Sequence, residues 1–357
     1  MNSLLRSLVA RPSRWIPLCL CLLLLSLSFV YTPFALPSVQ VTFPTTTAPN
    51  PLVVDPSPPP SAEIPPAPLT ADWSRFAYAQ YVTNTAYLCN SVMFFEALQR
   101  HDSKAQRVMM YPRTMMAPDA TDANGNYDAG LLIKARDEYG VKLSPIDVQH
   151  KVTSDTTWAD SYTKLLVFNQ TQYARVLSVD SDSLLMHHMD ELFFTPAAPI
   201  AMPRAYWLYP KQKVLSSQLM LVTPSAAEFQ RVQRAIQQVA NNEYDMEIVN
   251  TLYGDSAVVL PHRAYDMLSA EFRATDHAKY LGSADEKWDP VAAYNEAKMV
   301  HFSDWPVPKP WRLVSPEMRN KHGPKCDGSG GRAECAEWKL WNSLYDDFAA
   351  KRKEVCG

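Results

Sequence analysis

Two aspartates, one residue apart, follow an apolar run near the middle of the chain. Residues 173–179, YARVLSV, predict a buried β-strand because polar and apolar side chains do not alternate, and Asp180, Ser181 and Asp182 come directly after it. Ligands bind at the carboxyl ends of such strands in open α/β sheets. Two carboxylates that turn inward there repel each other unless a cation lies between them. The pattern predicts a divalent metal site, although a short Asp-x-Asp sequence also occurs as a solvated turn.

A second stretch with chemically useful side chains, KMVHFSDWPVPKPW, covers residues 298–311. Its start predicts a strand that brings His301 to a sheet edge, and its prolines stiffen a loop that presents Lys309. A histidine can bind a metal and a lysine a phosphate, but a packed aromatic loop would give a similar sequence. Another polar cluster lacks a recognised ligand spacing, so we expect surface or helix-start residues there. Its members are His187, His188, Asp190 and Glu191.

The elements before the aspartates alternate between strand and helix patterns. This β-α-β-α-β order predicts one α/β domain with a parallel sheet and helices on both faces. The expected strands are 75–82, 108–111 and 141–146, and the expected helices are 88–100 and 131–139. The expected later elements are a strand over 214–223, a helix over 225–240 that starts with a capping box, and an amphipathic helix over 333–355.

The first 70 residues differ from the rest. Residues 1–14 carry three arginines and no acid, and residues 15–36 are almost wholly apolar and long enough to cross a bilayer. No Ala-x-Ala site follows, which favours an uncleaved anchor over a cleaved signal peptide. The arginines place residues 1–14 in the cytosol and the rest in the lumen, a type II topology. Residues 37–70 are rich in Pro, Thr and Ser and predict an extended stalk, which leaves 71–357 as the globular domain.

The composition restricts partners and compartment. A net charge of -3 and the lack of any Lys/Arg block argue against a nucleic-acid partner. Four of the 6 cysteines would be lumenal and able to form up to two disulfides. Three of these lie near the C-terminus, which favours a local bridge such as Cys326–Cys335, but the sequence does not determine the pairing. Asn169 begins the one Asn-x-Ser/Thr sequon.

Six short motifs occur in an order that resembles glycosyltransferase family 8, the glycogenin-like nucleotide-sugar transferases. They are YVTNTAY, TKL, VDSD, SSQLMLVTPS, DMEIVN with LP nearby, and HFSDWPVPKPW, and they span roughly residues 75–311. Each is weak alone, but six in this order are specific. Within the family, the sequence is most similar to fungal Golgi N-acetylglucosaminyltransferases, whose anchor and stalk it also matches.

The resemblance implies a GT-A fold, a Rossmann-like α/β domain with a mostly parallel mixed sheet that binds a UDP-sugar and Mn²⁺. It implies that Asp180, Asp182 and His301 bind the metal. Lys309 would neutralise the β-phosphate, and Lys164 would meet the donor near the metal. A metal and a lysine stabilise the charge that develops on a diphosphate leaving group. The residues that would hold the nucleotide are Tyr81, Val82, Thr83, Asn84, Tyr87 and Ser181.

Two departures from the family pattern affect the catalytic residues. Family members commonly have Asn-Ser-Gly where this chain has Ser216, Ser217 and Gln218, and Asp-Gln where it has Asp245 and Met246. Methionine cannot act as a polar nucleophile, so the polar catalytic work falls to Asp245 or to Gln218. The family retains the anomeric configuration, and we favour a front-face displacement in which the leaving phosphate accepts the acceptor's proton.

The resemblance, together with the predicted anchor and stalk, implies a Golgi enzyme that transfers a sugar from a UDP-sugar to a glycan acceptor, with GlcNAc favoured through the likeness to the fungal enzymes. UDP-glucose and UDP-galactose are the alternative donors. A second hypothesis is a secretory-pathway protein that binds nucleotide sugars or glycans without turnover, because Met246 replaces the polar residue. A metal phosphohydrolase with Asp180 as nucleophile is disfavoured, because it needs a further acidic cluster downstream that the sequence lacks.

Overall fold

The computed structural model describes residues 61–65, 68, 70–152, 156–326 and 331–357. The predicted cytosolic tail (1–14), the predicted transmembrane segment (15–36) and most of the predicted stalk (37–70) lie outside these residues. Within the described ranges, no helix combines the length and the apolar character that a membrane span requires. The fold described below is that of the predicted globular domain. The domain boundaries predicted from the sequence stay predictions.

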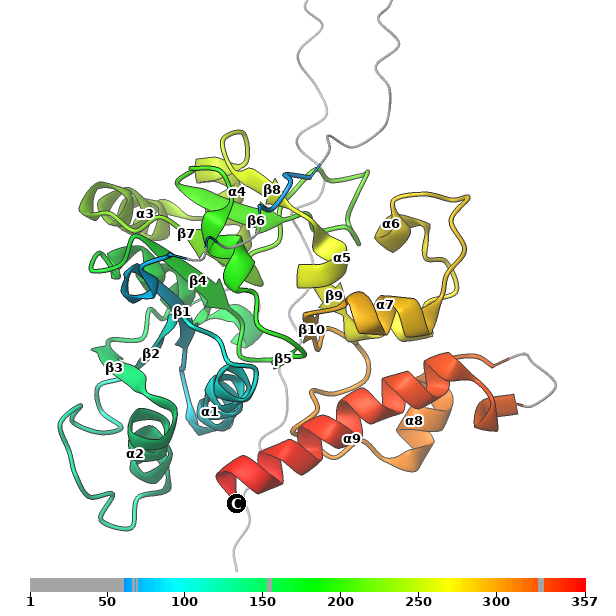
Figure 1. The fold of residues 1–357 in the computed structure, drawn as a ribbon, viewed down its shortest axis with the longest axis horizontal. Coiled ribbons are helices and arrows are strands. Elements are labelled where there is room, and N and C mark those ends of the chain that lie inside the picture. Colours follow the sequence, from blue (N-terminus) through cyan, green and yellow to red (C-terminus); the bar gives the residue numbers. More distant parts are fainter. Residues whose placement is uncertain (1–60, 66–67, 69, 153–155, 327–330) are drawn as a thin grey trace, which may run out of the picture. The chain divides into compact units, whose positions relative to one another are not determined.

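A seven-stranded sheet forms the centre of the domain (Figure 1). Its strands are β1 (Phe76–Tyr81), β2 (Gln106–Pro112), β3 (Val141–Ile146), β4 (Arg175–Val179), β6 (Ile200–Pro203), β7 (Leu219–Val222) and β8 (Val258–Leu260). Their order in the sheet is β3-β2-β1-β4-β7-β6-β8. β1 pairs in parallel with β2 and β4, whereas β7 is antiparallel to both β4 and β6. The mostly parallel mixed sheet predicted from the sequence is confirmed.

Helices cover both faces of this sheet (Figure 1). The face that carries Tyr78 and Leu177 packs against α1 (Thr85–Arg100) and α2 (Tyr127–Tyr139). The face that carries Ala77 and Val176 packs against the 3-10 helix Ser161–Asn169, α3 (Ala226–Gln238) and α4 (Asp245–Tyr253). Neighbouring strand residues enter opposite cores because side chains alternate along a strand. Both cores are apolar, which explains why the central strands show no alternation in sequence.

A three-stranded sheet brings the second chemical stretch to the end of β4. It consists of β5 (Ser183–Leu185), β10 (Met299–His301) and β9 (Met267–Leu268), with β10 in the middle. β5 begins immediately after Asp182 and runs antiparallel to β10, with His301 opposite Ser183. This register places His301 next to Asp182, although the two are 119 positions apart in sequence. Residues that no local pattern connects are thus joined by strand pairing.

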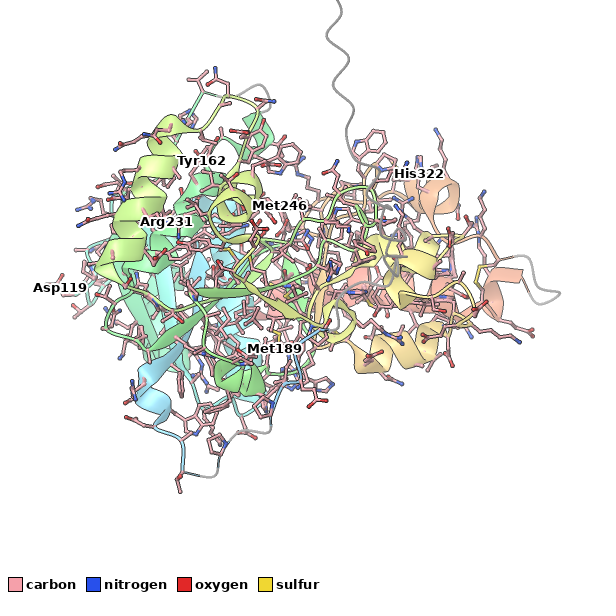
Figure 2. The ribbon with its side chains drawn as sticks, turned by 90° about the horizontal axis from the view of Figure 1, so that it is seen from above. Asp119, Tyr162, Met189, Arg231, Met246 and His322 are labelled. Atoms are coloured by element: carbon pink, nitrogen blue, oxygen red, sulfur yellow. A yellow bond between two sulfur atoms is a disulfide. The ribbon has the colours of Figure 1, made fainter. Side chains whose placement is uncertain are left out.

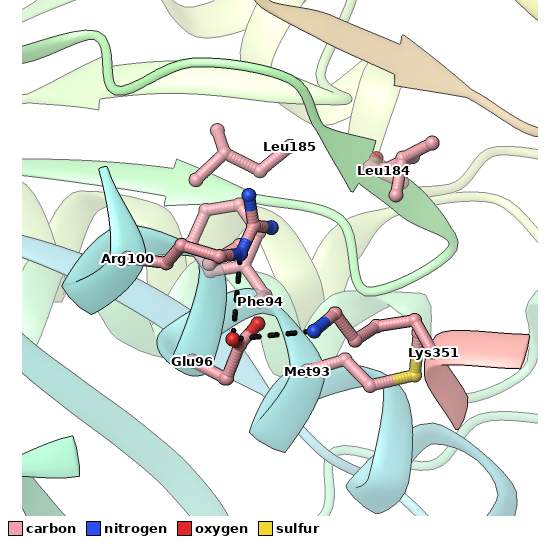
Figure 3. A pocket seen from close by; sticks show the side chains of 9 residues that line it. Met93, Phe94, Glu96, Arg100, Leu184, Leu185 and Lys351 are labelled. Carbon is pink, nitrogen blue, oxygen red and sulfur yellow. Dashed lines mark hydrogen bonds and ion pairs between the residues drawn. The ribbon is translucent and has the colours of Figure 1, made fainter. Parts of the chain in front are cut away.

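The terminal helix α9 (Ala336–Cys356) is linked to α1 by covalent and ionic contacts. A disulfide joins Cys89 to Cys356, with Cα atoms 6.0 Å apart. Glu96 pairs with both Arg100 and Lys351 at 3.4 Å, and these side chains line a cavity of about 20 Å³ between α1, β5 and α9 (Figure 3). A cavity of this size holds about one water molecule, so it is no nucleotide site.

A second disulfide, Cys326–Cys335, confirms the local bridge that the sequence favours. We expect it to stabilise the domain less than the Cys89–Cys356 disulfide. The two bridges span 9 and 267 residues, and loop-closure entropy then predicts about 2–3 and about 5–6 kcal/mol, respectively. Denaturant unfolding of the two double Cys→Ser variants should show the larger loss for the long loop. Equal losses would mean that the unfolded chain already keeps α1 and α9 together.

Three element boundaries differ from the sequence expectations. α1 begins at Thr85, three residues before the expected start at 88, because the Asn84 side chain accepts hydrogen bonds from N–H groups of the first turn. α2 begins at Tyr127 instead of 131, with Asn126 as its cap. The strand expected over 214–223 is reduced to β7, because the residues before it contact the candidate site.

Candidate active site

Asp180, Asp182 and His301 meet at the carboxyl end of β4. Atoms able to bind a metal, one from each residue, all lie within 4.8 Å of one another. The two aspartates follow β4 directly, and His301 is the last residue of β10. Their side chains are 14%, 16% and 7% exposed, respectively, so the cluster opens to solvent only narrowly. The structure thus brings together the three residues that the sequence and the family resemblance suggest as metal ligands.

Asp182 is held by a histidine and a lysine. His301 Nε2 lies 3.0 Å from Asp182 Oδ1, and Lys309 Nζ donates to Asp182 Oδ2 at 2.7 Å and to the Phe302 carbonyl. Burial alone would raise the pKa of Asp182, but His301 and Lys309 hold it well below its usual range. Burial lowers the pKa of His301. The imidazole is therefore neutral at pH 7, which is the form that binds metals.

Lys164 connects the aspartate pair to Asp245. Its Nζ lies 2.9 Å from Asp180 Oδ1 and 2.7 Å from Asp245 Oδ2, and it donates to the Ser217 carbonyl at 3.2 Å. Burial opposes the charge of Lys164, but Asp180 and Asp245 raise its pKa above the usual value. Burial raises the pKa of Asp180 to about 7 despite the nearby charge of Lys164. Burial also opposes the charge of Asp245, but Lys164 and Ser217 outweigh it and lower the pKa of Asp245. Asp245 is therefore ionised at pH 7, and Asp180 titrates near neutrality.

The segment before β7 contacts Asp180 and Asp245. The Ser217 hydroxyl donates to Asp245 Oδ2 at 2.7 Å, and the Asp180 N–H donates to the Gln218 carbonyl at 2.9 Å. Gln218 Oε1 is buried and has no hydrogen-bond partner among the described residues. Met246, labelled in Figure 2, is the second residue of α4 and offers only a thioether. Both predicted catalytic residues, Asp245 and Gln218, thus adjoin the cluster, and the role of Ser217 is one that the sequence did not reveal.

Most of the predicted nucleotide-binding residues lie between the end of β1 and the first turn of α1, whereas Ser181 follows β4. The Tyr81 ring centroid is 5.9 Å from Lys164 Nζ. Burial, with Asp182 and Asp180 nearby, raises the pKa of Tyr87 to about 12, and its ring meets Trp311 edge-on at 5.3 Å. Trp311 also lines a cavity of about 540 Å³ between its loop and α9. The Asn84 side chain is exposed but already caps α1. The remaining members are Val82 and Ser181, both buried, and Thr83, half-buried.

The expectation of surface or helix-start residues at 187–191 holds for Asp190 as a helix start, although this residue is buried. This residue starts a 3-10 helix, Asp190–Phe194, but it is only 3% exposed. It accepts hydrogen bonds from the Tyr78 and Ser103 hydroxyls and from the Lys104 N–H, each at 2.8 Å. These donors replace the water that a buried carboxylate loses, so Asp190 anchors the fold.

Asp266 lies close to the site and carries no signal in the sequence. Its side chain is fully buried, and neither carboxyl oxygen has a hydrogen-bond partner among the described residues. It precedes β9, whose Leu268 pairs with His301, so alternation places Asp266 on the same face of the small sheet as His301. Burial raises its pKa to about 7.

We expect Asp266→Asn to stabilise the metal-free protein more at pH 8 than at pH 5. The carboxyl has a pKa of about 7 in the folded state against 3.8 as its ordinary value. Between these values the folded state binds the proton more readily, so its stability falls as the pH rises to about 7. The whole shift corresponds to at most roughly 4 kcal/mol. Thermal unfolding at both pH values measures the effect, and equal midpoints for the two proteins at pH 8 would contradict it.

The cluster has the chemistry of a divalent metal site. Two carboxylates and a neutral imidazole provide oxygen and nitrogen donors, a set that suits Mn²⁺ better than metals that prefer sulfur. His301 Nδ1 is buried and has no partner among the described residues. Asp180, Asp182 and His301 would hold the ion. Lys309 and Lys164 would then provide positive charge beside it.

Comparison with known proteins gives the family. No protein-family model matches the chain. Glucose N-acetyltransferase 1 of Gibberella zeae is 58% identical over 288 residues, which are 80% of this chain and 63% of that protein, so the chain spans under two thirds of its length. The Aspergillus fumigatus protein of the same name is 45% identical over 301 residues, 80% of this chain and 78% of that protein. Among solved structures, the bifunctional glycosyltransferase WbbM matches with a TM-score of 0.51 and 15% identity over 82% of this chain and 52% of its own.

The mixed sheet and the likeness to WbbM define a GT-A-like glycosyltransferase fold, a class that typically uses a divalent metal. The chain belongs to the family of fungal proteins named Glucose N-acetyltransferase 1. The resemblance to family 8 glycosyltransferases, drawn from six ordered motifs, is thereby confirmed.

Proposed function

We propose that the protein is a retaining glycosyltransferase that uses Mn²⁺ to move a sugar from a UDP-sugar to a glycan acceptor in the Golgi lumen. One observation carries the proposal: Asp180, Asp182 and His301 gather within 4.8 Å, and Lys309 and Lys164 bond to the carboxylates. The acids suit a cation, and the two ammonium groups suit the negative charges of a diphosphate. A UDP-sugar bound through its metal satisfies both halves of this site.

The residues have distinct tasks in this mechanism. A bound Mn²⁺ would offset the charge that develops on the leaving diphosphate. Lys309 adds a second positive charge on the same side. Asp245 is ionised because Lys164 and Ser217 lower its pKa, so it can stabilise positive charge at the anomeric carbon but cannot donate a proton. We favour a front-face displacement, in which a leaving phosphate oxygen takes the proton of the acceptor hydroxyl, because Met246 supplies no nucleophile.

The identity of the donor rests on the relatives. Their name joins glucose to an N-acetyl group, which supports GlcNAc as the transferred sugar. Taken literally, the name describes acetyl transfer to glucose. A carboxylate–imidazole cluster flanked by two lysines suits a metal-bound diphosphate better than an acyl thioester. UDP-glucose and UDP-galactose are the other donors to compare.

A second candidate function is nucleotide-sugar or glycan binding without turnover. Met246 favours it, because this side chain beside Asp245 lacks the polar group that family members commonly carry. Gln218, with an unpartnered and buried Oε1, is the residue that would compensate. If it does not, the protein would bind UDP and release no sugar.

A donor panel separates these functions. The purified protein is incubated with UDP-GlcNAc, UDP-glucose, UDP-galactose and acetyl-CoA, and product release is measured with Mn²⁺ and with EDTA. The proposal predicts UDP release from UDP-GlcNAc that EDTA abolishes and added Mn²⁺ restores. Activity undiminished by EDTA would contradict it, and UDP binding with no release from any donor would favour the binding protein.

The cellular location is a separate part of the proposal. The apolar segment 15–36 would anchor the protein in the Golgi membrane with the catalytic domain in the lumen. Two disulfides and an exposed Asn169 in a sequon suit an oxidising, glycosylating compartment. In microsomes, Asn169→Gln should remove a mobility shift caused by endoglycosidase, and added protease should spare the domain. Digestion of the domain in intact vesicles would overturn the topology.

A further inference from the structure

The loop formed by residues 303–308 begins and ends at Asp182. The N–H of Phe302, before the loop, donates to the Asp182 carbonyl at 2.9 Å, and Lys309, after the loop, donates to the Asp182 carboxylate at 2.7 Å. Trp305 lies in this loop, four residues from both His301 and Lys309. Chain length alone therefore keeps its Cα within about 14 Å of each of them.

Hydrogen bonds and a buried ion pair hold the backbone at Trp305 in place. Arg273 Nη2 donates to the Trp305 carbonyl at 2.7 Å, and the Arg273 guanidinium also pairs with the Asp304 carboxylate. Asp304 is 4% exposed and accepts hydrogen bonds from Trp341 Nε1 and the Tyr345 hydroxyl, both at 2.8 Å. A buried ion pair with two further donors thus holds this part of the loop against α9.

The side chain on this fixed backbone is open to water. Trp305 is 88% exposed, compared with 51% for Trp158, the other tryptophan among the exposed large apolar side chains of the described residues. Exposing an indole forgoes the free energy that its burial would give. Trp305 thus presents an aromatic face to solvent from a backbone that hydrogen bonds hold in place, within the loop that connects His301 to Lys309.

We propose that Trp305 is the platform on which a pyranose ring of the acceptor glycan stacks. The inference rests on the proposed function and names the part of the site that receives the acceptor. One face of a pyranose ring consists largely of C–H bonds, which carry slight positive charge, and the face of an indole is negative. The hydroxyl groups at the ring edge stay solvated in this arrangement. The loop would then serve both substrates, with Lys309 at the donor phosphates and Trp305 at the acceptor.

The dimensions favour a sugar over a protein partner. An indole offers about 150–250 Å² of surface, whereas a stable protein interface takes about 800 Å² per partner. The apolar neighbour Val307 is buried, so it does not extend the surface. Leu313 is 95% exposed but lies outside the loop. It therefore provides a control, because a protein- or membrane-binding patch on this segment would use both side chains.

Acceptor kinetics test the proposal with Trp305→Ala, Trp305→Phe and Leu313→Ala. The acceptors are the methyl glycosides of glucose, galactose and mannose, at saturating UDP-GlcNAc and Mn²⁺. For the glycoside that wild type uses best, Trp305→Ala should raise the acceptor KM by about tenfold, the factor that about 1.4 kcal/mol represents. Trp305→Phe should restore most of the affinity, and Leu313→Ala should keep the wild-type acceptor KM.

Two outcomes would overturn the inference. One is an unchanged acceptor KM in Trp305→Ala, and the other is an equal rise in Trp305→Ala and Leu313→Ala, which would indicate a patch for a protein or a lipid surface. Thermal unfolding checks that Trp305→Ala is folded, since an exposed side chain contributes little to stability. If the proposed function itself were wrong, Asp182→Asn would release UDP as fast as wild type. This variant therefore distinguishes a failure of the proposed function from a failure of the inference about Trp305.

Discussion

Asp182→Asn is expected to lower sugar transfer by about a thousandfold or more, with loss of Mn²⁺ binding. Asparagine keeps the shape of the side chain but removes the charge. His301 and Lys309 both contact the Asp182 carboxylate, so the variant loses one metal ligand and the charged partner of these two side chains. The measurements are kcat/KM from UDP release and the Mn²⁺ dissociation constant from calorimetry.

Asp147→Asn is the matched control for this prediction. Asp147, like Asp182, is paired with a cationic side chain, in this case Arg113. This pair lies at the surface, with Asp147 71% and Arg113 58% exposed. Exposed pairs contribute little, so this variant should keep wild-type transfer and Mn²⁺ affinity. Transfer by Asp182→Asn at the level of the control would remove Asp182 from the mechanism.

Lys164→Met is expected to reduce the stability of the metal-free protein by about 3–5 kcal/mol at pH 8. Lys164 is 3% exposed, and its ammonium group touches the carboxylates of both Asp180 and Asp245. Methionine fills most of the space but leaves two buried carboxylates without a countercharge. Denaturant unfolding in EDTA measures the loss, and Lys104→Met, at an exposed lysine, provides the control.

Added Mn²⁺ should partly rescue the Lys164→Met variant. A cation at Asp180 would replace some of the positive charge that the ammonium supplied, so Mn²⁺ should raise the unfolding midpoint of the variant more than that of wild type. A stability loss in EDTA no larger than that of Lys104→Met would show that the three charges are not coupled. An equal Mn²⁺ shift in both proteins would show that the metal is bound away from Asp180.

The position of the aspartate pair could be predicted from the sequence because its signal is local. An unbroken apolar strand indicates burial on both faces, and the end of such a strand is where α/β sheets bind ligands. Asp180 and Asp182 lie at that end. His301 and Lys309 came from a second recognisable stretch, and the family resemblance connected the two.

Other parts of the site depend on contacts between distant segments. Asp245 starts a helix, where an acid is usually a dipole partner, and only the fold places it against a lysine 81 positions away. Asp266 is buried because β9 pairs with β10, and Asp190 because three donors from β1 and from the loop between α1 and β2 surround it. Burial of a carboxylate is a property of the tertiary structure, and the residues next to it in sequence do not encode it.

Anomalous diffraction from crystals grown with Mn²⁺ and UDP tests the central claim most directly. The account predicts one manganese peak bound by Asp180, Asp182 and His301, with the diphosphate on its open side and in contact with Lys309. A manganese peak elsewhere, or UDP bound away from the end of β4, would contradict the account.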